Sequence, residues 1–265
     1  MSSSAGQVWW HDGADDDHDG FARRTVTVQL IALAIDAVAP NELARFWARA
    51  LRWNARDADG VGVELVPTDA TSLHVVFRPV AHDKAGQNRI HFDLTTTSLD
   101  DRNDTVAHFL AIGARHIDIG QDPSDTHVVL ADPEGNEFCI IEPDNRFLAG
   151  CPRLGAVNCD GTHALGCFWS EALGWPLVWD QDEETAIRAP DGTGPKITWS
   201  GPPLMPKSGE ERFHFHIAPT SGTGAPAALQ HLLSLGATCR DTGHACPGGI
   251  ALADIDGNEF CLVEP

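Results

Sequence analysis

The side chains best suited to chemistry are the cysteines and histidines, and two of the cysteines end the same short motif. Residues 132–139 read DPEGNEFC, and residues 254–261 read DIDGNEFC. The chain has seven cysteines, an odd number, and none lies in a C-x-x-C pair. This spacing predicts neither a disulfide framework nor a zinc ribbon. Cys139 and Cys261 suit a transition-metal site if ionised, or a buried apolar position on a sheet if not.

Histidines occur where a strand is expected. In His214-Phe215-His216 the alternation places both imidazoles on one face, where they can be hydrogen-bonded strand residues or ligands.

The chain contains no tyrosine, and it lacks the G-x-S-x-G, P-loop and G-x-G-x-x-G motifs. Serine hydrolases, nucleotide triphosphatases and dinucleotide enzymes therefore have no support. A net charge of −20 disfavours nucleic acid and anionic membranes, so a small molecule or a protein is the expected partner.

The elements that must position these residues come in two copies. Asp132 and Asp254 are 122 residues apart, a distance typical of a domain rather than of a solenoid repeat. Other landmarks return at an offset of 122 or 123, among them Phe46-Trp47 with Phe168-Trp169 and Arg89-Ile90-His91-Phe92 with Arg212-Phe213-His214-Phe215. We predict a domain over residues 25–145, a linker at 146–151 and a second domain over 152–265.

Residues 1–24 precede the first copy. They are acidic, glycine-rich and aperiodic, so we predict a mobile leader unless Trp9 and Trp10 dock on the protein. They lack a basic start and an apolar centre, so no signal peptide is expected. Together with the cysteine usage, this predicts a cytoplasmic location. The run Asp15-Asp16-Asp17 does not have the spacing of a calcium loop.

Within the first copy the periodicity changes in a fixed order. Residues 25–34 are β-branched and aliphatic, as in a buried strand, and residues 42–51 place Phe46 and Trp47 on the core face of a helix. Short strands follow, with glycine, proline and aspartate between them. Residues 89–95 begin the same series again, with a helix over 102–113 and a last strand over 138–141. Each copy is therefore predicted to contain two βαβββ modules.

This arrangement resembles the vicinal oxygen chelate superfamily, which includes glyoxalases, bleomycin-resistance proteins and extradiol dioxygenases, and in particular its glyoxalase-like domains of actinobacterial type. The resemblance rests on the paired βαβββ modules, the Phe-Trp helix, the N-R-x-H-x-D strand, the L-x-x-G-A helix end and the D-P-x-G-N-E-F-C hairpin. It implies an α+β fold of tandem glyoxalase-like domains, each with two βαβββ modules forming a curved mixed sheet around a cleft. It also implies an internal pseudo-dimer of the two copies, in a chain that is a monomer or a homodimer.

The resemblance also implies positions for metal ligands. On those positions this chain has Gln29 on the first strand, His91 on the fifth and Cys139 on the last, where the family has a glutamate. Gln29, His91 and Cys139 could together hold zinc, nickel, manganese or iron in the first domain. No carboxylate lies on the fourth strand, within residues 73–79. The resemblance therefore leaves open whether any metal binds.

Three functions remain open. The first is binding, and sequestration or resistance, of a small organic molecule in a partly aromatic cleft without an obligatory metal. The second is a metal-dependent lyase, isomerase or dioxygenase with its site in the first domain. The third is a scaffold whose acidic tail engages a basic protein. For ligand binding, the candidate residues are Trp179, Trp199, His214, His216 and Cys261.

Overall fold

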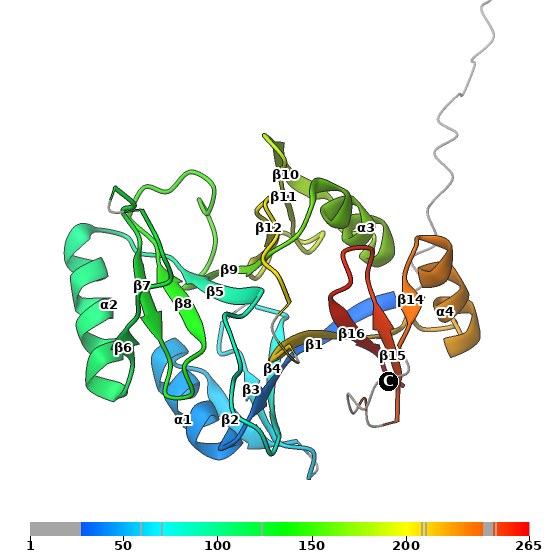
Figure 1. The fold of residues 1–265 in the computed structure, drawn as a ribbon, viewed down its shortest axis with the longest axis horizontal. Coiled ribbons are helices and arrows are strands. Elements are labelled where there is room, and N and C mark those ends of the chain that lie inside the picture. Colours follow the sequence, from blue (N-terminus) through cyan, green and yellow to red (C-terminus); the bar gives the residue numbers. More distant parts are fainter. Residues whose placement is uncertain are drawn as a thin grey trace, which may run out of the picture.

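The computed structural model describes residues 28–264, apart from positions 59, 70, 123, 208, 210, 241–245 and 247. The leader predicted at residues 1–24, with Trp9 and Trp10, lies outside the described residues. The described chain forms four βαβββ modules, one after another along the sequence (Figure 1). No helix within the described part is long and apolar enough to cross a bilayer.

The modules share one order of elements. The first contains β1 (Val28–Ala37), α1 (Pro40–Leu51), β2 (Asn54–Asp57), β3 (Val63–Val66) and β4 (His74–Pro79). The second contains β5 (Ile90–Leu94), α2 (Leu99–Ile112), β6 (Arg115–His116), β7 (Val128–Ala131) and β8 (Glu137–Ile140). The third contains β9 (Leu154–Cys159), α3 (His163–Leu173), β10 (Leu177–Gln181), β11 (Glu184–Ile187) and β12 (Lys196–Trp199). The fourth contains β13 (Phe213–Pro219), α4 (Ala225–Ser234), β14 (Thr238–Cys239), β15 (Ile250–Ala253) and β16 (Glu259–Leu262).

Helix ends follow the local sequence. Helix α2 begins where the Ser98 hydroxyl accepts a hydrogen bond from the Asp101 backbone N–H at 3.0 Å, and Thr162 caps α3 in the same way through Leu165 at 3.3 Å. Helix α2 stops at Gly113, whose φ of 119° is a conformation that residues with a Cβ rarely adopt.

The modules form two mixed sheets of eight strands, and each sheet combines one module from each copy. Sheet A has the order β14-β15-β16-β13-β1-β4-β3-β2, and sheet B has the order β10-β11-β12-β9-β5-β8-β7-β6. The two copies meet through antiparallel pairs, β1 with β13 in sheet A and β5 with β9 in sheet B. The predicted fold class is confirmed, and the copies form an internal pseudo-dimer. The expectation that each copy would build its own sheet is corrected, because the central strands pair between copies.

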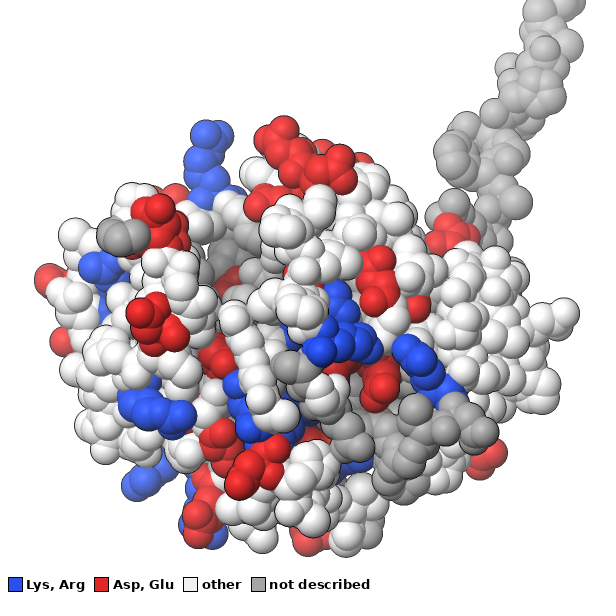
Figure 2. All heavy atoms as spheres, viewed as in Figure 1, with Lys and Arg blue, Asp and Glu red and all other residues white. Residues whose placement is uncertain are grey.

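Two equivalent arginines strengthen these junctions. Arg89, just before β5, binds the Asp160 carboxylate with Nε at 2.8 Å, and Arg212, just before β13, donates from Nη1 to the Asp36 backbone carbonyl at 2.8 Å. Both arginine side chains are buried. On the face drawn in Figure 2, basic side chains lie among acidic ones rather than in a broad patch of one sign.

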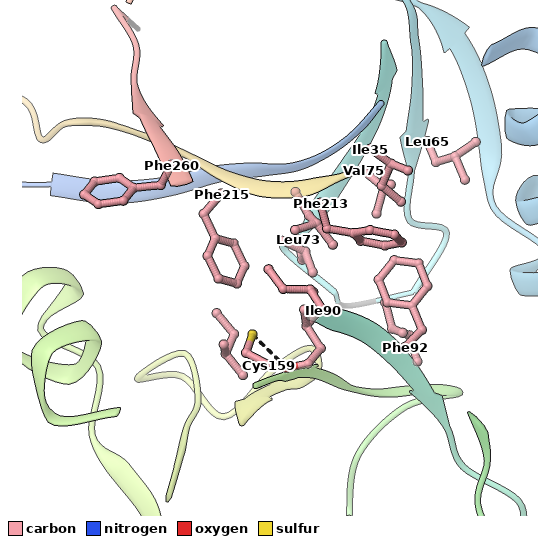
Figure 3. Packing of buried hydrophobic residues seen from close by; sticks show 14 of the residues in the cluster. Ile35, Leu65, Leu73, Val75, Ile90, Phe92, Cys159, Phe213, Phe215 and Phe260 are labelled. Carbon is pink, nitrogen blue, oxygen red and sulfur yellow. Dashed lines mark hydrogen bonds between the residues drawn. The ribbon is translucent and has the colours of Figure 1, made fainter. Parts of the chain in front are cut away.

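The core lies between the sheets. Phe92 of β5 meets Phe213 of β13 with ring centroids 5.8 Å apart, and Figure 3 shows aliphatic side chains around this contact. Helix α1 contributes Trp47, whose ring packs edge-on against Phe92 and against Phe138 of β8, at 5.0 Å each. Trp169 of α3 makes the matching contacts with Phe215 and Phe260. The prediction that the Phe-Trp pairs face the core is therefore confirmed.

The repeated hairpin holds these tryptophans. Asp132 is fully buried; its carboxylate accepts from the Trp47 indole Nε1 at 3.1 Å and from the backbone and side chain of Asn136. Asp254 binds Trp169 Nε1 at 3.4 Å through the same arrangement in the other copy. The motif recurs once in each copy, where it ties the helix of the first module of that copy to the hairpin of its second module.

Candidate functional site

A cleft of about 510 Å³ opens on sheet B, and we call it the sheet B cleft. Its polar lining comes from the strands of the sheet and from neighbouring loops: His91, Asp93, His127, Cys139, Asn145, Asn158, Glu184, Thr198 and Ser200. Its apolar lining consists of Ile119, Ile141, Phe147, Leu148 and Trp199. Residues of both copies therefore build this one cleft, whereas the donors that cluster in it, His91, Asp93 and Cys139, all belong to the first copy.

Three of these side chains converge because of strand geometry. His91 and Asp93 lie two residues apart on β5 and so share a face of the sheet, and Cys139 on β8 is the register partner of Asp93. His91 Nε2 lies 3.4 Å from Asp93 Oδ1. The potential ligand atoms of the three residues all lie within 4.8 Å of one another.

Asn158 extends this cluster from the other copy. It lies on β9 opposite His91, and its Nδ2 donates to Asp93 Oδ2 at 3.3 Å. Its Oδ1 in turn accepts from the Ser200 hydroxyl at 2.9 Å. The hydrogen bonds orient the Asn158 amide and leave Asp93 held between an amide and an imidazole.

The charges in the cluster follow from its burial and contacts. Burial lowers the pKa of His91, but hydrogen bonds and charge from Asp93 and Cys139 outweigh this effect and hold the pKa well above 6.5. Burial raises the pKa of the Cys139 thiol; His91 opposes this increase, whereas Asp93 adds to it. Asp93 and Cys139 therefore favour the protonated form of His91, whereas burial disfavours the thiolate form of Cys139.

The sequence-predicted tryptophans take different places. Trp199 lines the sheet B cleft, although only 1% of its surface is exposed. Trp179 does not line the cleft itself. Its ring packs edge-on against that of Phe147, which does, with ring centroids 5.1 Å apart. Phe147 lies within the predicted linker, where the sequence carried no signal of a binding role.

Gln29 does not join His91 and Cys139. It lies on β1 of sheet A, opposite Ala218 of β13, whereas His91 and Cys139 lie in sheet B. There it lines a separate cavity of about 510 Å³, together with hydroxyl side chains such as Thr220 and Ser221. Of the three predicted metal ligands, the structure brings together two and adds Asp93 as the third donor.

The equivalent positions of sheet A also gather potential ligands but form a closed cluster. His214 and His216 of β13 and Cys261 of β16 have donor atoms within 4.8 Å of one another. Cys261 and His214 are fully buried, and Cys261 forms a disulfide with Cys246. The cysteine spacing, which predicts no disulfide framework, did not reveal this single bond. The predicted ligand-binding residues His214, His216 and Cys261 lie together, away from the sheet B cleft.

The donors in the sheet B cleft fit a divalent metal by type. Imidazole, carboxylate and thiolate are all zinc ligands, and three protein ligands with one open position are typical of catalytic zinc. A metal would have to displace the proton of the His91 imidazolium and that of the Cys139 thiol. Of the metals expected from the sequence, these donors suit zinc best.

The comparisons with known proteins agree with the fold. The family model described as "Glyoxalase-like domain" matches residues 32–141 and 156–263, so the chain belongs to this family and carries the domain twice. The structure is similar to glyoxalase I from Zea mays, with 14% identity, coverage of 90% of this chain and 92% of that chain, and a TM-score of 0.60. It is also similar to a putative dioxygenase from Bacillus subtilis, with 14% identity, 90% and 85% coverage and a TM-score of 0.55. No curated protein sequence matches significantly.

Proposed function

We propose that this glyoxalase-like protein binds a small organic molecule carrying oxygen substituents in the sheet B cleft, without an obligatory metal. The observation that carries the proposal is the composition of the cleft, in which an aromatic and aliphatic wall faces a polar floor within about 510 Å³. Cavities of this size with few, convergent polar groups are typical of small-molecule sites.

The floor would recognise oxygen atoms of the ligand. The His91 imidazolium is a charged donor, and Asn158 and Ser200 offer an amide and a hydroxyl beside it. Phe147 and Trp199 would contact the apolar part of the ligand. Burial raises the pKa of the Cys139 thiol and so disfavours the thiolate that a bound cation would require, which favours a floor that works without a metal.

A metal-dependent lyase, isomerase or dioxygenase is the second candidate, favoured by the convergence of His91, Asp93 and Cys139. A metal bound there would act as a Lewis acid toward vicinal oxygens of a substrate. Under this alternative Asn158 would hold the Asp93 carboxylate in place through its 3.3 Å hydrogen bond. The walls of the cleft would orient the substrate and exclude water.

Calorimetric titration of the full-length protein with catechol, a small aromatic diol, tests both candidates. The protein is stripped with chelator and titrated without metal and then with one equivalent of Zn²⁺. His91→Ala should weaken metal-free binding about tenfold or more, the effect of losing a hydrogen bond from a charged donor. His108→Ala, an exposed change on α2, serves as the matched control.

The outcomes separate the candidates. Metal-free binding that needs His91 but not His108 supports the proposal. Binding that appears only after Zn²⁺ is added, and is lost in His91→Ala, supports the metal-dependent enzyme instead. Absence of binding in both conditions, or equal binding by the His91→Ala variant, would overturn the proposed role of the cleft.

A further inference from the structure

The cluster in sheet A has the donors of a metal site but cannot use one of them. His214 and His216 lie two residues apart on β13 and present their rings to one face, with centroids 5.0 Å apart. Cys261 on β16 is the register partner of His216, and donor atoms of all three residues lie within 4.8 Å of one another. Two imidazoles and one thiolate form a zinc-type ligand set.

The disulfide decides whether that set is available. Sγ of Cys261 is bonded to Sγ of Cys246, and a disulfide sulfur is not the anionic ligand that a zinc site uses. Two equivalents of a small thiol can reduce this bond, which gives two cysteine thiols and one disulfide of the small thiol. Cys261 can then lose its proton to solvent and bind a cation as the thiolate.

We propose that sheet A holds a second metal site, formed by His214, His216 and Cys261, that is available only when the Cys246–Cys261 disulfide is reduced. The ligand is a borderline-soft divalent cation, with Zn²⁺ favoured over Mg²⁺ or Ca²⁺. Under oxidising conditions the same sulfur instead fastens the chain at Cys246 to β16 of sheet A. The proposal is independent of the function proposed for the sheet B cleft.

The surroundings of the cluster differ from those of the sheet B cleft. His214 faces Ala34 on β1, which adjoins Val76 on β4, whereas His91 faces Asn158, which adjoins Thr198. Aliphatic side chains beside a buried metal–thiolate centre restrict the access of solvent to it. Arg78 lies beside the cluster: its Nη1 is 3.4 Å from His216 Nε2, and its Nε is paired with Asp36 at 3.2 Å. A pairing with Asp36 offsets the repulsion that the guanidinium would exert on a bound cation.

Metal titration of the full-length chain in its two redox states tests the proposal. The background carries Cys139→Ser, so that thiolate signals from the sheet B cleft are absent. Co²⁺ is the probe, since thiolate ligation produces a near-ultraviolet charge-transfer band, and Zn²⁺ competition gives the affinity. The other cysteines among the described residues, at positions 151, 159, 167 and 239, are free in both redox states and supply a common baseline.

The reduced protein should bind about one equivalent of Co²⁺ with a thiolate band, and the oxidised protein should not. Cys246→Ser should bind without reductant, because Cys261 is then never oxidised within the chain. His216→Ala should weaken the binding by the reduced form at least tenfold, and Cys239→Ser, at an exposed cysteine, should leave it unchanged.

Several results would overturn the proposal. Equal Co²⁺ binding in both redox states would show that the disulfide does not control the cluster, and binding that survives His216→Ala would place the metal elsewhere. If alkylation labels no more thiols in the reduced protein than in the oxidised protein, the disulfide is absent and the proposed switch does not exist. If Cys246→Ser fails to fold, the comparison of oxidised and reduced Cys139→Ser protein still decides the question.

Discussion

Two buried aspartates should make the protein more stable at mildly acidic pH than at neutral pH. Asp132 and Asp254 are each 5% exposed or less, and burial raises the pKa of both carboxyls from 3.8 to about 6. Hydrogen bonds from Asn136 and Trp47 in one copy, and from Asn258 and Trp169 in the other, oppose this shift without abolishing it. The folded state therefore takes up protons that the unfolded chain does not hold.

The size of the effect follows from linkage. A shift of about 2 pH units is worth about 3 kcal/mol for each carboxyl. Since the folded pKa is the higher one, this stabilisation is fully present below about pH 4 and is lost as the pH rises through about 6. When the pH falls from about 7 to about 5, roughly half of the stabilisation from each carboxyl develops. Both aspartates together should therefore add about 3 kcal/mol to the free energy of unfolding.

Urea unfolding followed by tryptophan fluorescence at pH 7 and pH 5 measures this difference. The comparison is between the natural chain and Asp132→Asn/Asp254→Asn, which cannot titrate at these positions. The raised pKa of His91 acts in the same direction, but equally in both proteins. Asp101 has a lowered pKa, so its contribution to the stability of the protein is lost only at pH values below the range from about 7 to about 5. An equal pH dependence in the two proteins would refute the assignment to the buried aspartates.

Three further changes test the packing and the exchange of modules. Gly166→Ala should cost about 1–2 kcal/mol in urea unfolding, because the added methyl group clashes with Thr185 and overpacking outweighs the gain in helix propensity; an unchanged stability would contradict this. Trp47→Phe should cost at least about 1.5–3 kcal/mol through the lost hydrogen bond to Asp132, and a loss below about 0.5 kcal/mol would show that the bond contributes little. Residues 28–151 expressed alone should form a homodimer in light scattering, since each copy needs strands of another; a folded monomer would contradict this.

The order of elements could be predicted because it depends on local pattern. The helix expected at 42–51 is found at Pro40–Leu51, and the strand expected at 138–141 at Glu137–Ile140. The partnership of the modules could not be predicted, because the strand edges offer the same backbone hydrogen bonds within a copy as between copies.

The site was predicted only in part for the same reason. His91 and Cys139 were identified, and Asp93 could have been found from the alternation within N-R-x-H-x-D, which puts it on the face of His91. Asn158 had no such signal, because its place beside His91 depends on the pairing of β5 with β9. Cys246 and Cys261 are 15 residues apart and form no recognisable motif, so their bond emerges only from the fold.

The exchange of modules also explains why the two sheets differ chemically although the chain is a repeat. Each sheet takes its four central strands two from each copy, so a ligand position of the first copy faces a different segment from its counterpart in the second. His91 therefore faces the amide of Asn158, whereas His214 faces Ala34. The polar partner keeps the floor of sheet B hydrophilic, as the proposed oxygen-bearing ligand requires. The aliphatic partner leaves the sheet A cluster buried. Under the proposed switch, metal binding there is controlled by oxidation of the Cys261 sulfur and not by access through a cleft.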